Sequence, residues 1–434
     1  MSTTRTFSVF DGPSWGHVSY ISDFFERFLH DRQWLPRRML LATGLLDLCR
    51  RYLDSRSERG RIISRARGSS SGNAEVRSML RKVASSADGK EARKTLDEIS
   101  IALRRGRQEA LPLEYVNVSR ALRRGGNLQE AKEYLRHALE MPLPKDERAT
   151  DRLLRTTSAE RGAISLAKRL IHIDDYLKSI IGYRAARTEG ARKIAVVSAI
   201  VGGYDAPLLP AYVENEMDYI IFSDQKVPDF GIFDVRPLPY VDIDKTRSAR
   251  YVKTHLTRIL GGYDVIIWLD GCIMPVAPLL PAIQDFVSSG CEFAAMLHPF
   301  RASPYEEMRM CIAIGKDDVP IIQRQREHYR SQGYKSHCLI ESNVFFVDAR
   351  SEKVTEMLDL WWEQIRRFSR RDQLSLNYCL DKTGVKWKEM APRGISARNH
   401  PNLVIFEHGQ VPEGYDQFAA EVNRRLSSDM PSSP

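Results

Sequence analysis

The chain has 434 residues, of which 43% are hydrophobic and 28% charged, so its composition is that of a soluble globular protein with two or more domains. Its six cysteines are scattered and form no CxxC pair or zinc-like spacing, which excludes a disulfide framework and a cysteine zinc site and favours reduced thiols in the cytosol. We expect no secretory signal, because residues 1–11 have no apolar core, and no membrane span, because no apolar run is long enough.

The net charge of +9 is unevenly distributed along the chain. Residues 1–192 hold 37 Lys and Arg against 24 Asp and Glu, a charge of +13, whereas the remainder holds 28 against 32, a charge of −4. The basic part could contact an anionic membrane face or a protein partner, or it could simply present solvated helix faces rich in arginine. We expect a cytoplasmic protein, peripheral at the inner membrane face in the first case, and no nucleic-acid partner.

Residues 1–190 are expected to form a basic helical domain. Apolar residues recur at helical spacing within 24–46, residues 65–72 are a flexible break, and residues 74–108 indicate two further helical segments. Residues 126–140 resemble the second half of a tetratricopeptide repeat: Gly126 ends one helix, and Ala131 and Ala138 allow close approach of its partner. Only one good copy is present, so the region is either a degenerate hairpin array or a single hairpin.

The pattern changes at residue 193. Buried strands are expected at 194–200, 219–222, 233–237, 264–269, 293–297 and 344–347, and helices at 248–260, 279–288, 319–329, 353–368 and 372–380. This alternation predicts an α/β domain over residues 191–420, with a mixed, mainly parallel sheet flanked by helices, and a disordered tail over 421–434.

Polar side chains follow several of these strands. In open α/β sheets ligands bind at the carboxyl ends of the strands, where a carboxylate can hold a divalent metal. Asp270-Gly271 ends a run of five apolar residues, although a plain strand-to-turn junction would have the same composition. The residues that follow the first two strands are Gly202, Gly203, Tyr204, Asp205 and Asp224. Their glycines allow backbone to approach a phosphate closely, or merely form a tight turn.

Two further clusters carry charge. Arg247, Arg250 and Lys253 are spaced by three on one helical face and could grip a diphosphate, or form a basic surface. Arg370 and Arg371 directly precede Asp372-Gln373, and their charges should keep the carboxyl group of Asp372 ionised. His408 follows a short apolar strand and enters a loop.

Together these blocks resemble a glycosyltransferase-like family of the GT-A type, formerly a domain of unknown function, with bacterial and plant mucilage-related members. The matching blocks lie in the family's order between residues 195 and 410 and include Gly202 to Asp205, Asp224, Arg250 to Lys253, Trp268 to Gly271, His298, Glu341 to Asn343, Trp361-Trp362 and Ser369 to Gln373 with Asn377. The resemblance implies a nucleotide-sugar-binding fold.

The resemblance also gives the residues roles. Such enzymes usually carry Asp-x-Asp, whose acids hold Mn²⁺ or Mg²⁺; here Cys272 replaces the second acid, and the expected metal ligands are Asp270 and His408. Alternatively, the three cations of the basic helix replace the metal. Asp372, Gln373 and Glu341 are the expected catalytic residues, and Asp372 is expected either to orient the donor sugar or to act as general base. The donor site is expected to include the residues named above and also His298, Asn343 and Arg371.

The sequence therefore predicts a cytoplasmic glycosyltransferase that moves a sugar from a nucleoside diphosphate sugar, UDP-linked by preference, to a glycan or lipid-linked acceptor. The alternative is a non-catalytic, tetratricopeptide-like adaptor with a degenerate transferase fold, which the missing second acid favours and the joint presence of Asp270, Asp372 and His408 disfavours. No nucleophile elbow or HExxH motif supports a hydrolase.

Overall fold

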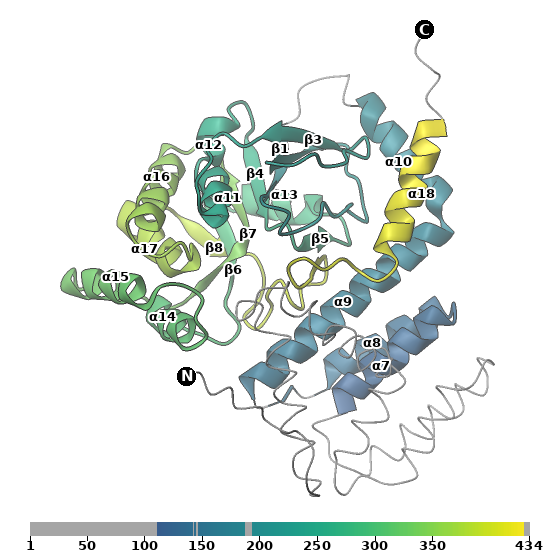
Figure 1. Ribbon diagram of the computed structural model, residues 1–434, viewed down its shortest axis with the longest axis horizontal. Coiled ribbons are helices and arrows are strands. Elements are labelled where there is room, and N and C mark those ends of the chain that lie inside the picture. Colours follow the sequence, from purple (N-terminus) through teal and green to yellow (C-terminus); the bar gives the residue numbers. More distant parts are fainter. Residues whose placement is uncertain (1–110, 142, 145, 187–192, 429–434) are drawn as a thin grey trace, which may run out of the picture. The chain divides into compact units, whose positions relative to one another are not determined.

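The computed structural model describes residues 111–141, 143–144, 146–186 and 193–428, which belong to one compact unit (Figure 1). The helical segments expected within 24–46 and 74–108, and the break at 65–72, lie outside the described residues. In the described part of the chain no helix is both long and apolar enough to cross a membrane.

Four helices precede the sheet: α7 (Leu111–Arg124), α8 (Leu128–Glu140), α9 (Glu147–Ile171) and α10 (Ile173–Ala186). Helices α7 and α8 form a hairpin in which Gly126 takes a φ of 85°, a left-handed conformation that favours glycine. The hydroxyl of Ser119 donates to the carbonyl of Ala131 at 2.8 Å, and Ala131 is fully buried, so the small residue does let the helices approach. The hairpin is present, whereas its assignment as a tetratricopeptide repeat stays a prediction.

A seven-stranded sheet forms the centre of the molecule, in the order β3-β2-β1-β4-β7-β6-β8. Its strands are β1 (Ile194–Ile200), β2 (Met217–Ser223), β3 (Phe233–Pro237), β4 (Val265–Leu269), β6 (Phe293–Leu297), β7 (Ile340–Asp348) and β8 (Trp387–Glu389). Only β7 runs against its neighbours. The predicted mixed, mainly parallel sheet flanked by helices is confirmed. A second, two-stranded sheet pairs β5 (Ile273–Pro275) with β9 (Leu403–Ile405).

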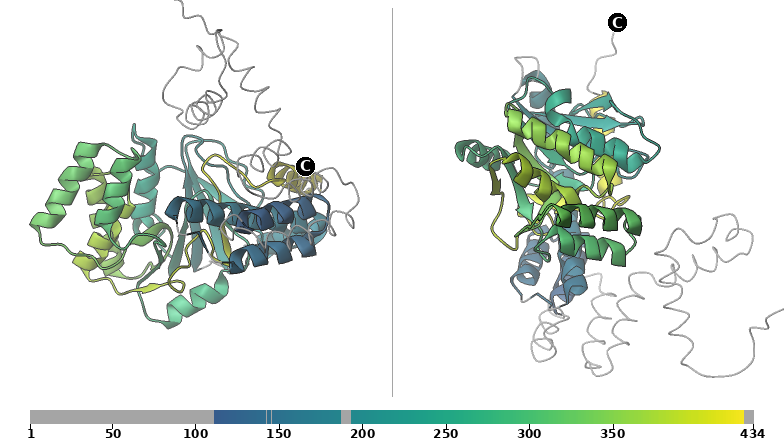
Figure 2. Two further views of the ribbon diagram at one scale, coloured as in Figure 1. Left: turned by 90° about the horizontal axis from the view of Figure 1, so that it is seen from below. Right: turned by 90° about the vertical axis from the view of Figure 1, so that its left-hand side faces the viewer.

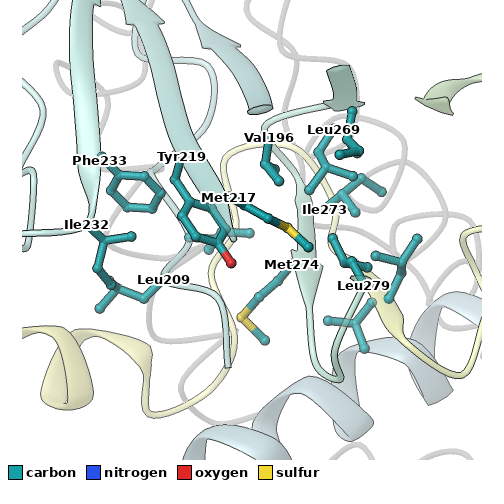
Figure 3. Packing of buried hydrophobic residues seen from close by; sticks show 14 of the residues in the cluster. Val196, Leu209, Met217, Tyr219, Ile232, Phe233, Leu269, Ile273, Met274 and Leu279 are labelled. Carbon is teal, nitrogen blue, oxygen red and sulfur yellow. The ribbon is translucent and has the colours of Figure 1, made fainter. Parts of the chain in front are cut away.

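Alternate strand residues point to opposite sides of the large sheet, and helices cover both of its faces (Figure 2). In β4, Ile267 and Leu269 join one core with Tyr176 and Tyr183 of α10, whereas Ile266 and Trp268 join the other. Figure 3 shows Leu269 in the first of these cores, together with Val196 and Ile273. The helices after β3 are α11 (Lys245–Thr254), α12 (Leu256–Ile259), α13 (Leu280–Ser288), α14 (Pro304–Ala313), α15 (Val319–Ser331), α16 (Glu352–Arg367), α17 (Gln373–Thr383) and α18 (Tyr415–Ser428).

Several expected boundaries differ from the structure, and two of these differences concern whole elements. The helix expected at 248–260 is divided at His255 into α11 and α12. The disordered tail expected over 421–434 is wrong for 421–428, because α18 continues through them and buries Val422 and Leu426 in the same core as α10; residues 429–434 lie outside the described residues. Since α10 lies before residue 190 and shares that core with the sheet, the helices there are packed as part of the α/β unit.

Candidate functional site

A cavity of about 770 Å³ lies at the carboxyl ends of β1 and β4. Its size is within the range usual for sites that bind small molecules. The predicted site residues that line it are Tyr204, Arg250, Asp270, His298, Glu341, Asn343, Arg371, Asp372, Gln373 and His408. They come from elements that are distant in sequence, so the fold itself assembles this set of side chains.

Lys253 holds two of the acids of the cavity wall together. Its ammonium group lies 3.1 Å from Asp270 Oδ1 and 2.6 Å from Asp372 Oδ2. The side chain is fully buried, with the rings of Trp268 and Trp361 within 6 Å of its nitrogen. A buried ammonium is stable only when it is paired, and here two carboxylates and two indole faces provide that environment. Lys253 therefore links the end of β4 to the start of α17.

Asp372 is ionised despite its burial. Burial alone would raise the pKa of its carboxyl group, but Arg250, Lys253 and Arg371 together lower that pKa well below its usual range. Nε of Arg250 lies 3.3 Å from Asp372 Oδ2. The prediction for the two preceding arginines is confirmed for Arg371, although Arg250 and Lys253 contribute more. Arg370 instead pairs with Asp244 and Asp317. A carboxylate as strongly paired as that of Asp372 is a weak base.

Asp270 and His408, the two predicted metal ligands, line the same cavity but have different partners. Asp270 Oδ1 accepts from the indole NH of Trp268 at 2.7 Å in addition to Lys253. His408 Nδ1 lies 3.1 Å from both carboxylate oxygens of Asp205, and its ring packs 4.6 Å from that of Tyr204. Asp205 is also adjacent to Gly271, whose position a side chain could not occupy without approaching the Asp205 carboxylate to 3.1 Å.

The side chains described in this part of the chain fit a divalent cation poorly. Within the described residues, no three His, Cys, Asp or Glu side chains lie close enough together to hold a metal ion. Cys272, at the place of the second acid, is a buried thiol whose pKa is raised by burial and by the nearby Asp270 and Asp205. A thiol in that state is neutral and a poor ligand. Binding of Mn²⁺ or Mg²⁺ therefore stays a prediction, and no step of the chemistry below passes through it.

The expected basic face of α11 is divided between different roles. Arg250 lines the cavity, whereas the ammonium group of Lys253 is paired with Asp270 and Asp372. Arg247 instead points to the carbonyl of Phe368, 3.4 Å from its Nη2, and does not line the cavity. The three cations therefore do not act together on one ligand.

Several other predicted residues support the site from outside the cavity lining. Asp224 accepts from the backbone NH of Gly202 at 2.8 Å and pairs with Lys245 at 3.0 Å. Gly202 and Gly203 have φ values of 68° and 66°, so they form the tight turn after β1 that glycine favours. Their contribution is to fix the loop that carries Tyr204 and Asp205.

His298, Glu341 and Gln373 line the cavity with part of their bonding capacity already used. Nδ1 of His298 accepts from the backbone NH groups of Phe300 and Arg301, both at 3.1 Å, and burial, with Arg301 and Arg398, lowers its pKa to about 3. The neutral ring therefore shapes the loop after β6. Glu341 forms an ion pair with Arg398, and Gln373 donates to the carbonyl of Ile340 at 3.1 Å.

Two buried polar atoms on residues of the wall, Nε of Arg371 and Oδ1 of Asn343, have no hydrogen-bond partner in the described part of the chain, and Nε of Arg250 has only its ion-pair contact with Asp372. Leaving such atoms unpaired is costly. The three side chains line the cavity, so its wall carries groups that could bind a polar ligand.

The sequence prediction missed the wall that α9 provides. Glu147, Arg148, Asp151 and Arg155 line the cavity together with Arg301 and Arg398. Nε of Arg398 lies 2.6 Å from Asp151, although these residues are 247 positions apart. The only sequence signal was a run of charged residues at helical spacing, which any solvated helix would also show.

Comparisons with known proteins agree with the resemblance. Residues 212–392 match the family model described as TOD1/MUCI70, glycosyltransferase-like domain. A protein of Arabidopsis thaliana named probable hexosyltransferase MUCI70 is 24% identical over 224 residues, which cover 45% of this chain and 38% of that protein. The chain thus spans well under half the length of this curated relative.

Solved structures of transferases also align with the chain. The apo form of mouse xyloside xylosyltransferase 1 aligns with a TM-score of 0.31 and 10% identity, covering 45% of this chain and 84% of that one. The galactosyltransferase LgtC, in complex with donor and acceptor sugar analogues, aligns with a TM-score of 0.31 and 12% identity, covering 55% of this chain and 97% of that one.

Proposed function

We propose that this chain, which carries a TOD1/MUCI70 glycosyltransferase-like domain over residues 212–392, transfers a glycosyl group from a nucleoside diphosphate sugar to a glycan or lipid-linked acceptor. A UDP-linked sugar is the preferred donor in this proposal. The cytoplasmic compartment stays a prediction that rests on the scattered cysteines, and any contact with a membrane or protein partner stays a prediction that rests on the charge of residues 1–192.

One observation carries the proposal. Asp270 and Asp372, 102 positions apart in sequence, meet around the buried Lys253 in the wall of a cavity at the carboxyl edge of the parallel strands. Two acids and a lysine buried together are costly to maintain as pure structure, because apolar side chains would fill the same volume without a desolvation penalty. Their retention at the ligand edge of the sheet favours a functional role.

The reaction would break the bond between the anomeric carbon and the leaving diphosphate oxygen and form a bond from that carbon to an acceptor hydroxyl oxygen, whose proton passes to a base. We assign to Asp372 the orientation of donor-sugar hydroxyl groups, since its lowered pKa makes it a poor base. The side chains of Arg250, Arg371 and Asn343 line the cavity beside it and supply further polar groups. These groups are held before the ligand arrives, which reduces the reorganisation that binding requires.

The first experiment is a thermal-shift series on the full chain with UDP, GDP, ADP and CMP, each with Mn²⁺ and with a chelator, followed by assay of turnover with the matching nucleotide sugars. We expect one nucleoside diphosphate to raise the melting temperature, and turnover in the presence of a glycan acceptor. If no nucleotide raises the melting temperature, the transferase proposal is wrong. Nucleotide binding without turnover on any donor would favour the non-catalytic adaptor.

The variant Asp270→Asn tests the location of the site. It should reduce turnover by roughly 100-fold or more, the usual effect of losing one preorganised polar group from an active site. The matched control is Asp285→Asn, an exposed acid of α13 that pairs with Lys388 outside the cavity lining. Equal turnover in the two variants would show that chemistry does not occur at the end of β4.

A further inference from the structure

Helix α9 lies before the matched domain, yet one of its faces borders the cavity. Glu147 and Asp151 pair with Arg301 and Arg398, respectively. Two turns further, the hydroxyl of Ser158 accepts from the backbone NH of Ile405 at 2.9 Å. Glu147 and Asp151 are four residues apart, and Asp151 and Ser158 are seven apart, so all three lie on one helical face.

The docking of α9 is close and leaves little room for adjustment. A side chain on Gly162 would approach the ring of Phe406 to 2.6 Å, so only glycine fits there. The backbone NH of Phe406 in turn donates to the carbonyl of Cys272 at 2.9 Å. Through this chain of contacts, the middle of α9 is fixed beside the segment that follows Asp270.

Arg155 lies on that face between Asp151 and Ser158, and it lines the cavity with Cys272 and Asp270. Its Nε donates to Asp151 Oδ2 at 2.9 Å, and in the described residues no partner contacts its two Nη groups. The side chain is 31% exposed. One bond to Asp151 thus orients the guanidinium group while the other donors remain available to a ligand.

Three other buried cations at or behind the cavity wall are already paired with two acids each. Lys253 contacts Asp270 and Asp372, Arg301 contacts Glu147 and Glu307, and Arg398 contacts Asp151 and Glu341. Cys272, which lines the cavity with Arg155, is a buried thiol where a second acid would help to hold a metal ion. The charge available on this side of Asp270 is therefore a guanidinium group.

We propose that Arg155 of α9 binds a phosphate group of the donor directly through its Nη donors, in place of a divalent cation at the position of Cys272. Guanidinium groups bind phosphate oxygens through bidentate hydrogen bonds and stay protonated at neutral pH. The proposal rests on the proposed function, and it makes the helical segment before the matched domain part of the donor site.

The test measures binding of UDP, inorganic pyrophosphate and uridine to the full chain by calorimetry, in the presence of a chelator. Arg155→Gln should weaken UDP and pyrophosphate by roughly tenfold or more, the usual effect of losing a charged hydrogen bond. Arg155→Lys should lose less affinity than Arg155→Gln, because lysine keeps the positive charge but cannot form the bidentate hydrogen bonds of a guanidinium group. Uridine carries no phosphate, so its affinity should be unchanged, whereas a merely structural role would lower it as well.

The matched control is Arg152→Gln, because Arg152 is an exposed arginine of the same helix that does not line the cavity. If Arg155→Gln and Arg152→Gln bind UDP equally well, or if UDP binds only with Mn²⁺, the role of Arg155 is refuted while the transferase proposal stands. If the unchanged chain binds no nucleotide with or without Mn²⁺, both proposals fail. Melting temperatures of the variants without ligand show whether each is folded.

Discussion

Replacing Lys253 with methionine is the most informative perturbation of this site. Methionine has a similar length and no charge, so Lys253→Met keeps much of the packing against Trp268 and Trp361 while removing the ammonium group. Asp372, whose side chain is 3% exposed, would keep only Arg250 at 3.3 Å among its present ion-pair contacts. Asp270, at 19% exposure, would retain the indole NH of Trp268 and some water.

The expected cost follows from these contacts. Removing one partner of a buried ion pair usually costs about 3–5 kcal/mol, because the other charge is left without compensation. Arg250 and the partial exposure of Asp270 place this case near the lower end, at about 3 kcal/mol. For a domain of this size each kcal/mol lowers the melting temperature by about 2–4 °C, so we expect a decrease of at least about 6 °C at pH 7.

The pH dependence gives the prediction its sign. The folded-state pKa of Asp372 is lowered, so its contribution to stability is present above the unfolded pKa of about 4 and is lost as the pH falls through the folded value. In Lys253→Met the ionised Asp372 contributes less to stability at neutral pH, because its ion pair with Lys253 is gone. The difference in melting temperature between the two proteins should therefore narrow below about pH 4.

Circular dichroism melting curves measure both effects. The matched control is Lys245→Met, because Lys245 is 53% exposed and its ion pair with Asp224 should contribute no more than about 1 kcal/mol. The double variant Lys253→Met with Asp372→Asn removes the uncompensated charge and should recover part of the loss. The reasoning would be refuted if Lys253→Met melted like the control, or if the double variant were no more stable than the single one.

Two further predictions concern packing and titration. Gly162→Ala should destabilise the protein by about 1–3 kcal/mol, because its methyl group would overlap the ring of Phe406, whereas Gly182→Ala in α10, with no atom within 4 Å, should stabilise it by about 0.5–1 kcal/mol. Urea unfolding distinguishes these outcomes, and equal effects would contradict the close docking of α9. Because the folded-state pKa of His298 is lowered to about 3, its contribution is present above the unfolded value of about 6.5 and is lost as the pH falls. Between pH 6.5 and 5 the free energy of unfolding should decrease by up to about 1.4 kcal/mol per pH unit from this group, and His298→Gln should remove that part of the slope; an unchanged slope would contradict it.

The strands that bury both faces were predictable from sequence, because their apolar runs are bounded by polar or turn-forming residues. The expected ranges 194–200 and 293–297 coincide with β1 and β6, and 233–237 coincides with β3, an edge strand that is mostly half-buried. The short apolar strand expected before His408 corresponds to β9, whereas the three-residue strands β5 and β8 are too short to show a period and were not predicted. The position of Asp270 at the end of β4 followed from the apolar run, since that signal is local.

The partners of the site residues could not be predicted in the same way. The spacing of Arg247, Arg250 and Lys253 predicted one row of cations, but burial of Lys253 depends on Asp270 and Asp372, which only the fold brings together. Asp205 becomes the partner of His408 because the loop after β1 and the loop after β9 meet beside Gly271. Such pairings depend on tertiary distance, which helical or strand periodicity does not contain.

The functional unit extends beyond residues 212–392. Strand β1 at Ile194–Ile200 lies between β2 and β4 in the sheet and is hydrogen-bonded to both. The matched range begins after β1, so that range alone lacks a central strand of the sheet. The cavity also needs Tyr204 and His408 from either side of that range, and α9 contributes Asp151 and Arg155 to the wall. Because Asp151 holds both Arg155 and Arg398, a change in α9 would displace a cation that also contacts Glu341. The helical segment before the sheet and the segment after residue 392 are thus coupled through the site itself, and differences in either would alter ligand binding without touching the matched domain.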